Sequence, residues 1–442
     1  MPRRVIIMGA GGRDYHVFNL LYRDNPEARV VAFTATQIPG LTWRRYPPRL
    51  AGPRYPAGIP IYPEELLPQL VHRHRVDEVV LAYSDLTAEE FAEKTALVLA
   101  TGARLRLPSP DETMIDSIKP VIAVTATKTG AGKSTVSRSL ALELKRRGVS
   151  VAVVRHPMAY GNLEEKEVIA VESKADLEKY SFTVEELEEY EPYTRIGVPV
   201  LAGIDYEKVL LRAEELGEII IWDGGNNDTP FIKPDIWICL VDATRPHTIY
   251  SYPGTINVIR ADHIIVTKVS EAGHIDEVIE EIKKLNKRAE ITLADLEPHL
   301  VEEEDLRGKK VLVIEDAPTV THGGAAFAAG YRAAVEAGAE VVDPRPYAHG
   351  VLKTVYEKYP HLGPVLPSMG YTEEELRALE ETINNAPVDA VVSATPAAIE
   401  RLIRINKPVI HVEYRLRVIK GPGVAELAEK AMKLLSERRR AQ

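Results

Sequence analysis

The residues with the clearest chemical meaning lie at positions 127–135, in the order Thr-Lys-Thr-Gly-Ala-Gly-Lys-Ser-Thr. An apolar run at 121–124 comes directly before them, and a helical pattern follows at 134–147. A strand, a glycine-containing loop and a helix in this order are typical of a P-loop, in which backbone N–H groups and the helix amino terminus surround a phosphate. The sequence therefore predicts that this segment binds a nucleotide.

Each residue of the loop has an expected role. Lys133 would reach the β- and γ-phosphates, and the Ser134 hydroxyl would hold Mg²⁺. The first glycine of the pattern G-x-x-x-x-G-K-[ST] is replaced by Thr127, so residues 128–134 look like the deviant form K-G-G-x-G-K-[ST], with Lys128 as its earlier lysine and Thr129 in place of a glycine. The predicted nucleotide-binding residues of the loop are Thr129, Gly130, Ala131, Gly132, Lys133, Ser134 and Thr135.

A P-loop needs an acidic partner for its metal, usually at the end of a neighbouring strand. The run 219–222 is apolar and ends at Asp223, which is followed by two glycines that allow the backbone to approach a γ-phosphate. Asp223 is therefore the expected second Mg²⁺ ligand, directly or through water.

A second strand end bears on the choice of nucleotide. Thr267 and Lys268 open a near match to the guanine-selective pattern [NT]-K-x-D, but Ser270 stands where the aspartate is expected. A serine hydroxyl cannot replace a carboxylate that accepts two hydrogen bonds from guanine. We therefore expect ATP rather than GTP, with Thr267 and Lys268 near the base, and GTP as the alternative.

Three further turns carry cations at strand ends, where open α/β sheets bind ligands. Residues 9–14 resemble a dinucleotide fingerprint, but Asp14 stands at its third glycine position. The other two turns are 155–157 and 319–324, and a further cation, Arg345, follows the second of them. Together they predict a site for an anionic substrate, and the residues expected to bind it are Arg13, Arg155, His156, His322 and Arg345. Whether His322 and Arg345 share a site with the P-loop stays open.

The elements that must position these residues alternate between strand-like and helix-like from end to end, which predicts an α/β fold with parallel sheets. We expect three consecutive doubly wound units: a Rossmann-like unit at 1–117, a P-loop NTPase unit at 118–305 and a C-terminal α/β unit at 306–442. Expected strands are 4–8, 29–33, 78–83, 104–107, 150–154, 218–222, 236–241, 263–267, 311–314, 340–343, 388–393 and 408–412, and expected helices are 15–23, 88–101, 134–147, 324–337, 372–384 and 397–405, with an acidic helical region at 163–190.

Composition limits the class of protein. The chain has 442 residues, a net charge of −10 and a single cysteine, Cys239, in an apolar run. The negative charge disfavours general binding to nucleic acid or anionic membranes, and no apolar run approaches a membrane span. One cysteine excludes an internal disulfide. These features predict a cytoplasmic protein, and the few Gln and Cys residues beside abundant Glu, Lys and Arg suggest a thermophilic source.

Residues 120–135, with Asp223, Thr267 and Lys268, resemble the P-loop branch that includes nitrogenase iron protein and dethiobiotin synthetase. In dimeric members of that branch the earlier lysine, here Lys128, reaches the nucleotide of the partner, so the resemblance implies a homodimer. Over nearly its whole length the chain is similar to predicted GTPases related to cyclic 2,3-diphosphoglycerate synthetase, on the segments 4–9, 35–40, 154–157, 222–228, 321–324 and 343–347.

The leading hypothesis is an enzyme, an NTP-dependent ligase or kinase that acts with Mg²⁺ on a small phosphorylated acid. The resemblance makes cyclic 2,3-diphosphoglycerate synthesis the named candidate. Lys133, Lys128, Asp223, Arg155 and His156 are the expected catalytic residues, acting by positioning and charge stabilisation. The alternative is a GTPase or ATPase switch or assembly factor that acts on a protein partner. A dinucleotide-dependent oxidoreductase built on 1–117 is a third possibility, with an incomplete glycine pattern.

Overall fold

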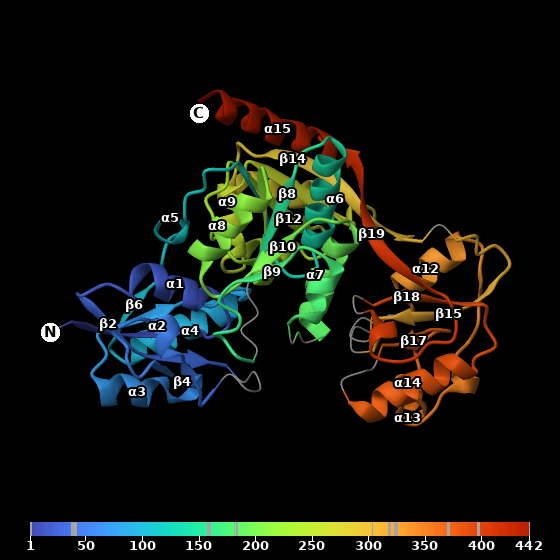
Figure 1. Cartoon of the computed structure of the whole chain (residues 1–442), viewed down its shortest axis with the longest axis horizontal. Coiled ribbons are helices and arrows are strands. Elements are labelled where there is room, and N and C mark those ends of the chain that lie inside the picture. Colours follow the sequence, from blue (N-terminus) through green and yellow to red (C-terminus); the bar gives the residue numbers. More distant parts are fainter. Residues whose placement is uncertain are drawn as a thin grey trace. The chain divides into compact units, whose positions relative to one another are not determined.

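The structure is a computed structural model, and it describes residues 2–36, 42–156, 161–180, 182, 184–302, 304–316, 320–321, 326–368, 372–395 and 398–441. The chain forms two compact units (Figure 1). Unit 1 comprises Met1–Asp295 and Leu416–Gln442, and unit 2 comprises Leu296–Arg415. Parallel strands alternate with helices in both units, so the predicted α/β class is confirmed. The division at residues 118 and 306 stays a prediction.

The first sheet of unit 1 has the strand order β3-β4-β2-β1-β5-β6. All its neighbouring strands are parallel except the β3–β4 pair, and its central strands bury apolar side chains on both faces, as parallel sheets covered by helices do. An aromatic cluster fills one side, where Tyr15 stacks on Tyr46 with ring centroids 4.6 Å apart. The elements are β1 (Arg3–Met8), α1 (Arg13–Leu21), β2 (Ala28–Ala35), β3 (Arg45–Tyr46), α2 (Pro48–Ala51), β4 (Ile59–Pro63), α3 (Leu67–His74), β5 (Glu78–Leu81), α4 (Ala88–Ala100), β6 (Arg104–Arg106) and α5 (Pro110–Thr113).

The second sheet of unit 1 contains the P-loop strand β7 (Val121–Ala126) at its centre. Its order is β14-β13-β12-β7-β11-β8-β10-β9, with β9 antiparallel to β10 at the edge. Every residue of β7 is buried, and each buried methylene group contributes about 0.8 kcal/mol to folding. The other elements are α6 (Lys133–Arg146), β8 (Val151–Arg155), β9 (Ile169–Val171), α7 (Val184–Arg195), β10 (Val200–Ala202), α8 (Tyr206–Leu216), β11 (Ile219–Asp223), β12 (Ile236–Asp242), α9 (Gly254–Arg260), β13 (His263–Thr267), α10 (Ile275–Leu285) and β14 (Glu290–Leu300).

The last helix, α15 (Val424–Ala441), belongs to the core of unit 1. Its apolar face, which includes Leu427, Ala431 and Leu435, packs in one cluster with Leu140 and Leu144 of α6 (Figure 1). The end of the chain thus supports the helix that begins at the P-loop.

Unit 2 has a smaller sheet in the order β16-β15-β18-β19, with β17 also paired to β15. β14 carries the chain from unit 1 into unit 2, and β19 carries it back. Two apolar clusters make its core, one on each side of β15 and β18. Its elements are β15 (Lys310–Glu315), α12 (Ala329–Glu336), β16 (Glu340–Val341), α13 (Val351–Lys358), β17 (Leu366–Pro367), α14 (Glu373–Asn385), β18 (Ala390–Ala394) and β19 (Val409–Lys420).

Some expected elements differ from the structure. The acidic segment 163–190 is not one helical region: β9 extends the sheet edge by pairing with β10, and a 3₁₀ turn follows at Lys174–Glu178 before α7 begins. In the described part of 397–405 the structure has only a 3₁₀ turn, Ile399–Arg401. The strand β14 was not anticipated, because Pro298 interrupts its pattern.

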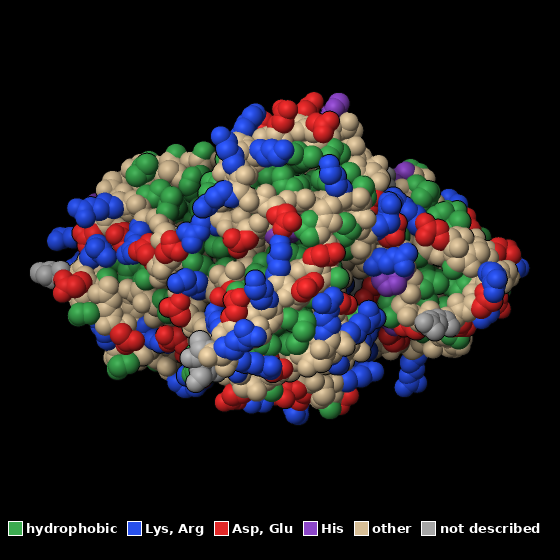
Figure 2. Space-filling view, turned by 90° about the horizontal axis from the view of Figure 1, so that it is seen from above, with side chains coloured by type: hydrophobic (Ala, Val, Ile, Leu, Met, Phe, Trp, Pro, Cys, Tyr) green, Lys and Arg blue, Asp and Glu red, His purple; other side chains and the backbone are tan. Residues whose placement is uncertain are grey.

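The surface of the described residues mixes both signs of charge. On the face drawn in Figure 2, Lys and Arg side chains are interspersed with Asp and Glu. Cys239 is buried in β12, as its apolar run predicts. Among the described helices, none is long and apolar enough to cross a membrane.

Candidate functional site

The P-loop joins β7 to α6 with the backbone shape that phosphate binding requires. Gly130 and Gly132 have positive φ angles of 87° and 101°, and Gly132 is the residue before the first turn of α6. A Cβ at Gly130 would also lie 3.2 Å from the Arg245 guanidinium. The loop conformation therefore requires both glycines, and the close contact with Arg245 adds a second reason at Gly130.

Lys133 is tied to the turn that follows β11. Its ammonium group donates to the Asn227 side-chain oxygen at 2.5 Å. Burial lowers the pKa of Lys133, and the carboxylates of Asp223 and Asp85 oppose this shift. The charged lysine is thus held in a partly buried setting that favours an added phosphate.

Asp85, which follows β5 in the first sheet, reaches the P-loop from the other half of unit 1. Its carboxylate accepts from Lys128 at 3.0 Å, from the Thr129 hydroxyl at 3.1 Å and from the Asn227 amide at 2.6 Å. Its backbone carbonyl also accepts from Lys128, at 2.5 Å. Lys128, Thr129 and Lys133 are therefore linked in one network through Asp85 and Asn227.

Asp223 lies buried at the carboxyl end of β11. One of its oxygens accepts from Arg155 and from the Tyr193 hydroxyl, the latter at 2.7 Å, while the other oxygen has no hydrogen-bond partner among the described residues. Arg155 also pairs with Glu189. Burial disfavours the charged guanidinium, but these two carboxylates outweigh burial and raise the pKa of Arg155. Asp223 thus has one oxygen that accepts hydrogen bonds within the protein and one that is available to a ligand.

Arg13 and His156 meet at a second buried carboxylate, Asp228. His156 Nδ1 lies 2.5 Å from one carboxylate oxygen, and an Arg13 nitrogen lies 3.6 Å from the other. Arg13 comes from the first sheet and the other two from the second, so this contact also joins the two halves of unit 1. Asp228 is only one residue from Asn227, which places both networks on the same turn after β11.

The predicted base-binding residues lie beside the loop. Thr267 donates to the Ala131 carbonyl at 2.9 Å, and Lys268 donates to Asp242 at 2.7 Å. Ser270, which replaces the guanine-selective aspartate, binds the Asp295 carboxylate with its hydroxyl and with its N–H at 2.8 Å. Arg417 pairs with the same carboxylate at 2.7 Å.

In the turn at 9–14, the Asp14 side chain binds the backbone N–H groups. The Asp14 carboxylate accepts from the N–H groups of Gly11 and Tyr15 at 2.9 and 2.8 Å, and Gly9 leaves room for it. Burial raises the pKa of Asp14 to about 6, although these N–H groups oppose the shift. The carboxylate thus binds N–H groups at the start of α1, the end of the helix at which a dinucleotide fingerprint binds its pyrophosphate.

Unit 2 contains two more of the predicted cation positions. Arg345 is exposed and forms a two-pronged pair with Asp343, with contacts of 2.5 and 2.9 Å. His322 lies outside the described residues. The structure therefore brings together in unit 1 the loop residues, Lys128, Asp223, Arg155, His156 and Arg13, and it shows Arg345 in a local pair of its own.

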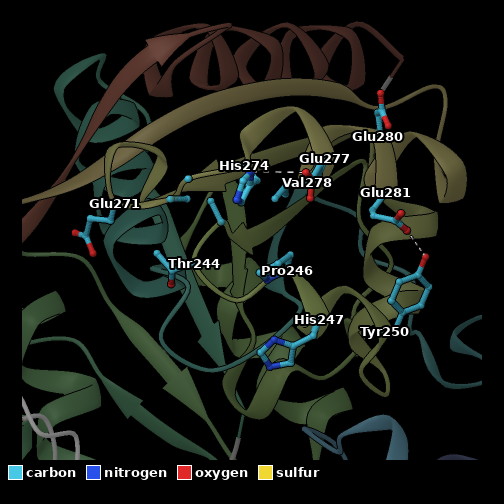
Figure 3. A pocket seen from close by; sticks show the side chains of 13 residues that line it. Thr244, Pro246, His247, Tyr250, Glu271, His274, Glu277, Val278, Glu280 and Glu281 are labelled. Atoms are coloured by element: carbon cyan, nitrogen blue, oxygen red, sulfur yellow. Dashed lines mark hydrogen bonds and ion pairs between the residues drawn. The ribbon is translucent and has the colours of Figure 1, made fainter.

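A hollow of about 620 Å³ opens next to α10 in unit 1 (Figure 3). It contains none of the predicted site residues. Figure 3 shows ionic and hydrogen-bonded pairs at its rim, where Tyr250 donates to Glu281 at 2.6 Å and His274 lies 3.6 Å from Glu277. Its lining residues Thr244 and Pro246 flank Arg245, which donates to the Thr129 carbonyl of the P-loop at 2.8 Å.

Asp85 and Tyr193 are site residues that sequence reasoning missed. Asp85 follows a short strand as any turn aspartate does, and only its positive φ of 60° in the folded chain distinguishes it. Tyr193 and Glu189 lie in an acidic helix that looks like a solvated surface. Asn227 follows Asp223 in the same turn, but nothing in its spacing indicates that it contacts Lys133.

Comparisons with known proteins agree with this geometry. Residues 122–306 match the CobQ/CobB/MinD/ParA nucleotide binding domain. The chain is 47% identical to arginine synthetase ArcE of Thermococcus kodakarensis over 431 residues, which cover 97% of this chain and 96% of ArcE. The chain belongs to the ArcE family.

More distant relatives carry another name. Cyclic 2,3-diphosphoglycerate synthetase of Thermococcus sibiricus is 27% identical over 48% of this chain and 52% of its own length, and that of Rubrobacter xylanophilus is 24% identical over 59% and 66%. Among solved structures, LpxK from Aquifex aeolicus in complex with ATP aligns with 78% of this chain and 95% of its own length. Its TM-score is 0.43 at 15% sequence identity, which is a weak likeness.

The expected relationship to cyclic 2,3-diphosphoglycerate synthetase and to the P-loop branch is confirmed. As a member of the ArcE family the chain is an enzyme, a P-loop NTP-dependent synthetase, as the sequence predicts.

Proposed function

We propose that this member of the ArcE family is an ATP-dependent synthetase whose product is arginine or a close guanidino compound. The observation that carries the proposal is the 47% identity to arginine synthetase ArcE over nearly the whole of both chains. An acceptor with a ureido group is the chemical counterpart of a guanidino product.

The reaction follows from bond balance. The γ-phosphoryl group of ATP passes to the ureido oxygen, releasing ADP and making that oxygen a good leaving group. Ammonia then attacks the carbon, a C–N bond forms, the C–O bond breaks, and the oxygen departs with inorganic phosphate. Positioning and charge stabilisation supply most of the catalysis in phosphoryl transfer.

The residues of the P-loop have defined tasks in this scheme. Backbone N–H groups around Gly130 and Gly132 and the Lys133 ammonium bind the phosphates. The Ser134 hydroxyl and Asp223 would hold Mg²⁺, since one buried Asp223 oxygen has no hydrogen-bond partner among the described residues. The ion would supply neutralisation of charge on the transferred phosphoryl group.

The charges beside the described cations support a neutral or cationic acceptor better than a polyanion. In unit 1, Arg155 faces Asp223 and Glu189, and Arg13 and His156 face Asp228. In unit 2, Arg345 faces Asp343. Each described cation that was expected to bind an anionic substrate therefore has a carboxylate beside it. Cyclic 2,3-diphosphoglycerate synthesis remains the second candidate, favoured by the similarity to enzymes of that name.

The same enzyme preparation tests both candidates. Purified protein and Lys133→Ala are incubated with Mg²⁺ and ATP or GTP, either with citrulline and ammonium or with 2,3-bisphosphoglycerate. We expect arginine and ADP from the first mixture, with ATP preferred and with no product from Lys133→Ala. A cyclic anhydride signal in phosphorus NMR of the second mixture would favour the other reaction. Neither product, from a protein that binds nucleotide, would reject both.

We expect a homodimer, no nucleic-acid partner and a cytoplasmic location, as the sequence predicts. These three points remain predictions.

A further inference from the structure

The earlier lysine of the P-loop has a partner inside its own chain. Lys128 contacts both the carboxylate and the backbone carbonyl of Asp85, at 3.0 and 2.5 Å. The resemblance to dimeric P-loop proteins implies instead that this lysine reaches the nucleotide of a second subunit. In this chain the first sheet of unit 1 supplies the group that holds it.

Asp85 is held in place independently of Lys128. The next residue, Leu86, exchanges two backbone hydrogen bonds of 2.9 Å with Tyr252, which lies just before α9 in the P-loop half of unit 1. Phe91 of α4 stacks on the Tyr252 ring, with centroids 4.7 Å apart. The segment that carries Asp85 is therefore docked against the P-loop half of unit 1 by contacts that do not involve its charge.

The network joins Asp85 to the second P-loop lysine as well. The Asn227 amide donates to Asp85 at 2.6 Å while its oxygen accepts from Lys133 at 2.5 Å. Asn227 has a positive φ of 53° and is almost fully buried, so its side chain has little freedom. Phosphates that enter the loop therefore compete with Asp85 for Lys128 and with Asn227 for Lys133.

We propose that Asp85 is a positioning residue of the nucleotide site. It holds Lys128 in the same chain, and it releases this lysine to the phosphates when a nucleoside triphosphate binds. Asp85 and Lys128 are each about three-quarters buried, at 27% and 23% side-chain exposure, so their attraction is only partly screened by solvent. The proposal rests on the proposed nucleotide site but not on the identity of the acceptor.

A double-mutant cycle tests the exchange. The affinity of a fluorescent, non-hydrolysable ATP analogue is measured for the full-length protein, Asp85→Asn, Lys128→Met and the double variant. We expect Asp85→Asn to lower the Kd roughly five-fold, because the phosphates no longer compete with the carboxylate for Lys128. In the Lys128→Met background the same change should have no further effect. An equal effect in both backgrounds, or none in either, would overturn the proposal.

Two further measurements separate this role from structural damage. Asp24→Asn, which removes an exposed carboxylate between α1 and β2, should leave the Kd unchanged. The KM for ATP in hydrolysis should fall in Asp85→Asn by the same factor as the Kd. A KM that stays constant while kcat falls would contradict the exchange.

Mixing variants tests whether Lys128 acts within one chain. Lys128→Met and Lys133→Met proteins are mixed, allowed to exchange subunits, and assayed for ATP hydrolysis. If Lys128 acts in its own chain, the activity equals the sum of the two separate proteins. Activity well above that sum would show that the lysine works across a subunit interface and would overturn the proposal. None of these assays uses the acceptor, so failure of arginine synthesis would not affect them.

Discussion

At the scale of single residues, buried carboxylates decide what the cationic turns of this enzyme can bind. Asp228 lies between Arg13 and His156, and Asp223 binds Arg155. Asp14 accepts hydrogen bonds from the N–H groups of its own turn. Glu315 does the same in unit 2, where it accepts from the first N–H groups of α12, and burial raises its pKa although those bonds oppose the shift. A cation that already faces a carboxylate has much less to offer a phosphorylated substrate.

The Asp223–Arg155 pair gives a prediction that separates stability from chemistry. Asp223→Asn leaves the buried Arg155 with Glu189 alone, and breaking a buried pair of this kind costs about 3 kcal/mol of unfolding free energy. We expect this loss in urea unfolding together with loss of ATP hydrolysis. Adding Arg155→Met should recover part of the stability, because both charges are then gone, but not the hydrolysis. Recovery of both would contradict a metal-binding role for Asp223.

A second residue-scale prediction concerns pH. His16 is buried against Phe231, and burial lowers its pKa to about 4 although its bond to the Thr113 carbonyl opposes this. Above pH 6.5 the histidine is neutral in both folded and unfolded chains, whereas between about pH 6.5 and 4 only the unfolded chain takes up the proton. Stability should therefore fall as the pH drops through that window, by at most about 3 kcal/mol from this residue.

The measurement compares urea unfolding at pH 7 and pH 4.5 for the natural protein and His16→Gln, which can still donate to Thr113. His16→Gln should lose less stability on acidification than the natural protein does. An equal loss in both would show that His16 is not the source.

The sequence predicts local chemistry at this scale better than it predicts partners. The roles of Gly130, Gly132 and Lys133 follow from spacing, because one loop and one helix contain all of them. The contacts of Lys128 with Asp85 and of Arg155 with Glu189 do not follow, because these carboxylates come from segments that are distant in sequence. Ser270 was recognised as a departure, but the Asp295 carboxylate beside it arrives from β14, a strand that the pattern did not indicate.

At the scale of elements, the central strands β7 and β12 were predictable because they are strongly apolar. The helix α14 was predictable because its buried apolar residues recur at helical spacing along a polar segment. The edge elements were not. β9 has three residues and gains its strand character from pairing with β10, so local pattern alone cannot identify it. The assignment of α15 to unit 1 depends on a contact between residues about 290 positions apart, which is a tertiary effect.

The packing of α15 on α6 leads to an element-scale prediction. Leu427 is almost fully buried in the cluster that includes Leu140 and Leu144 of α6. Leu427→Ala should lower the unfolding free energy by about 3 kcal/mol, because it leaves a cavity beside the P-loop helix. Lys433→Ala, at an exposed position of the same helix, should change stability by no more than about 0.5 kcal/mol. Equal effects in chemical unfolding would contradict the packing.

At the scale of the whole molecule, the two units differ in what they contain. Unit 1 holds the complete P-loop network, and unit 2 has its own apolar clusters. The chain leaves unit 1 at Asp295 and returns at Leu416, and Asp295 pairs with Arg417 at 2.7 Å, so the exit and the return lie next to each other.

This arrangement predicts that unit 1 can be made without unit 2. A chain in which a short Gly/Ser linker joins Asp295 to Leu416 should fold and bind a fluorescent ATP analogue with the Kd of the full-length protein, because it retains every contact of the loop. The control is the same shortened chain with Lys133→Ala, which should bind weakly. Loss of binding in a folded shortened chain would show that unit 2 contributes to the nucleotide site.

The aspartate in the first turn has a consequence for the engineering of this enzyme. Gly9 and Gly11 already stand where a dinucleotide fingerprint needs them, and the third required glycine is replaced only by Asp14. The Asp14 carboxylate occupies N–H groups of this turn that could otherwise bind an anion. An aspartate codon becomes a glycine codon by a single base change, so one mutation would free these groups. We expect Asp14→Gly to leave an anion-binding turn open at the amino end of α1.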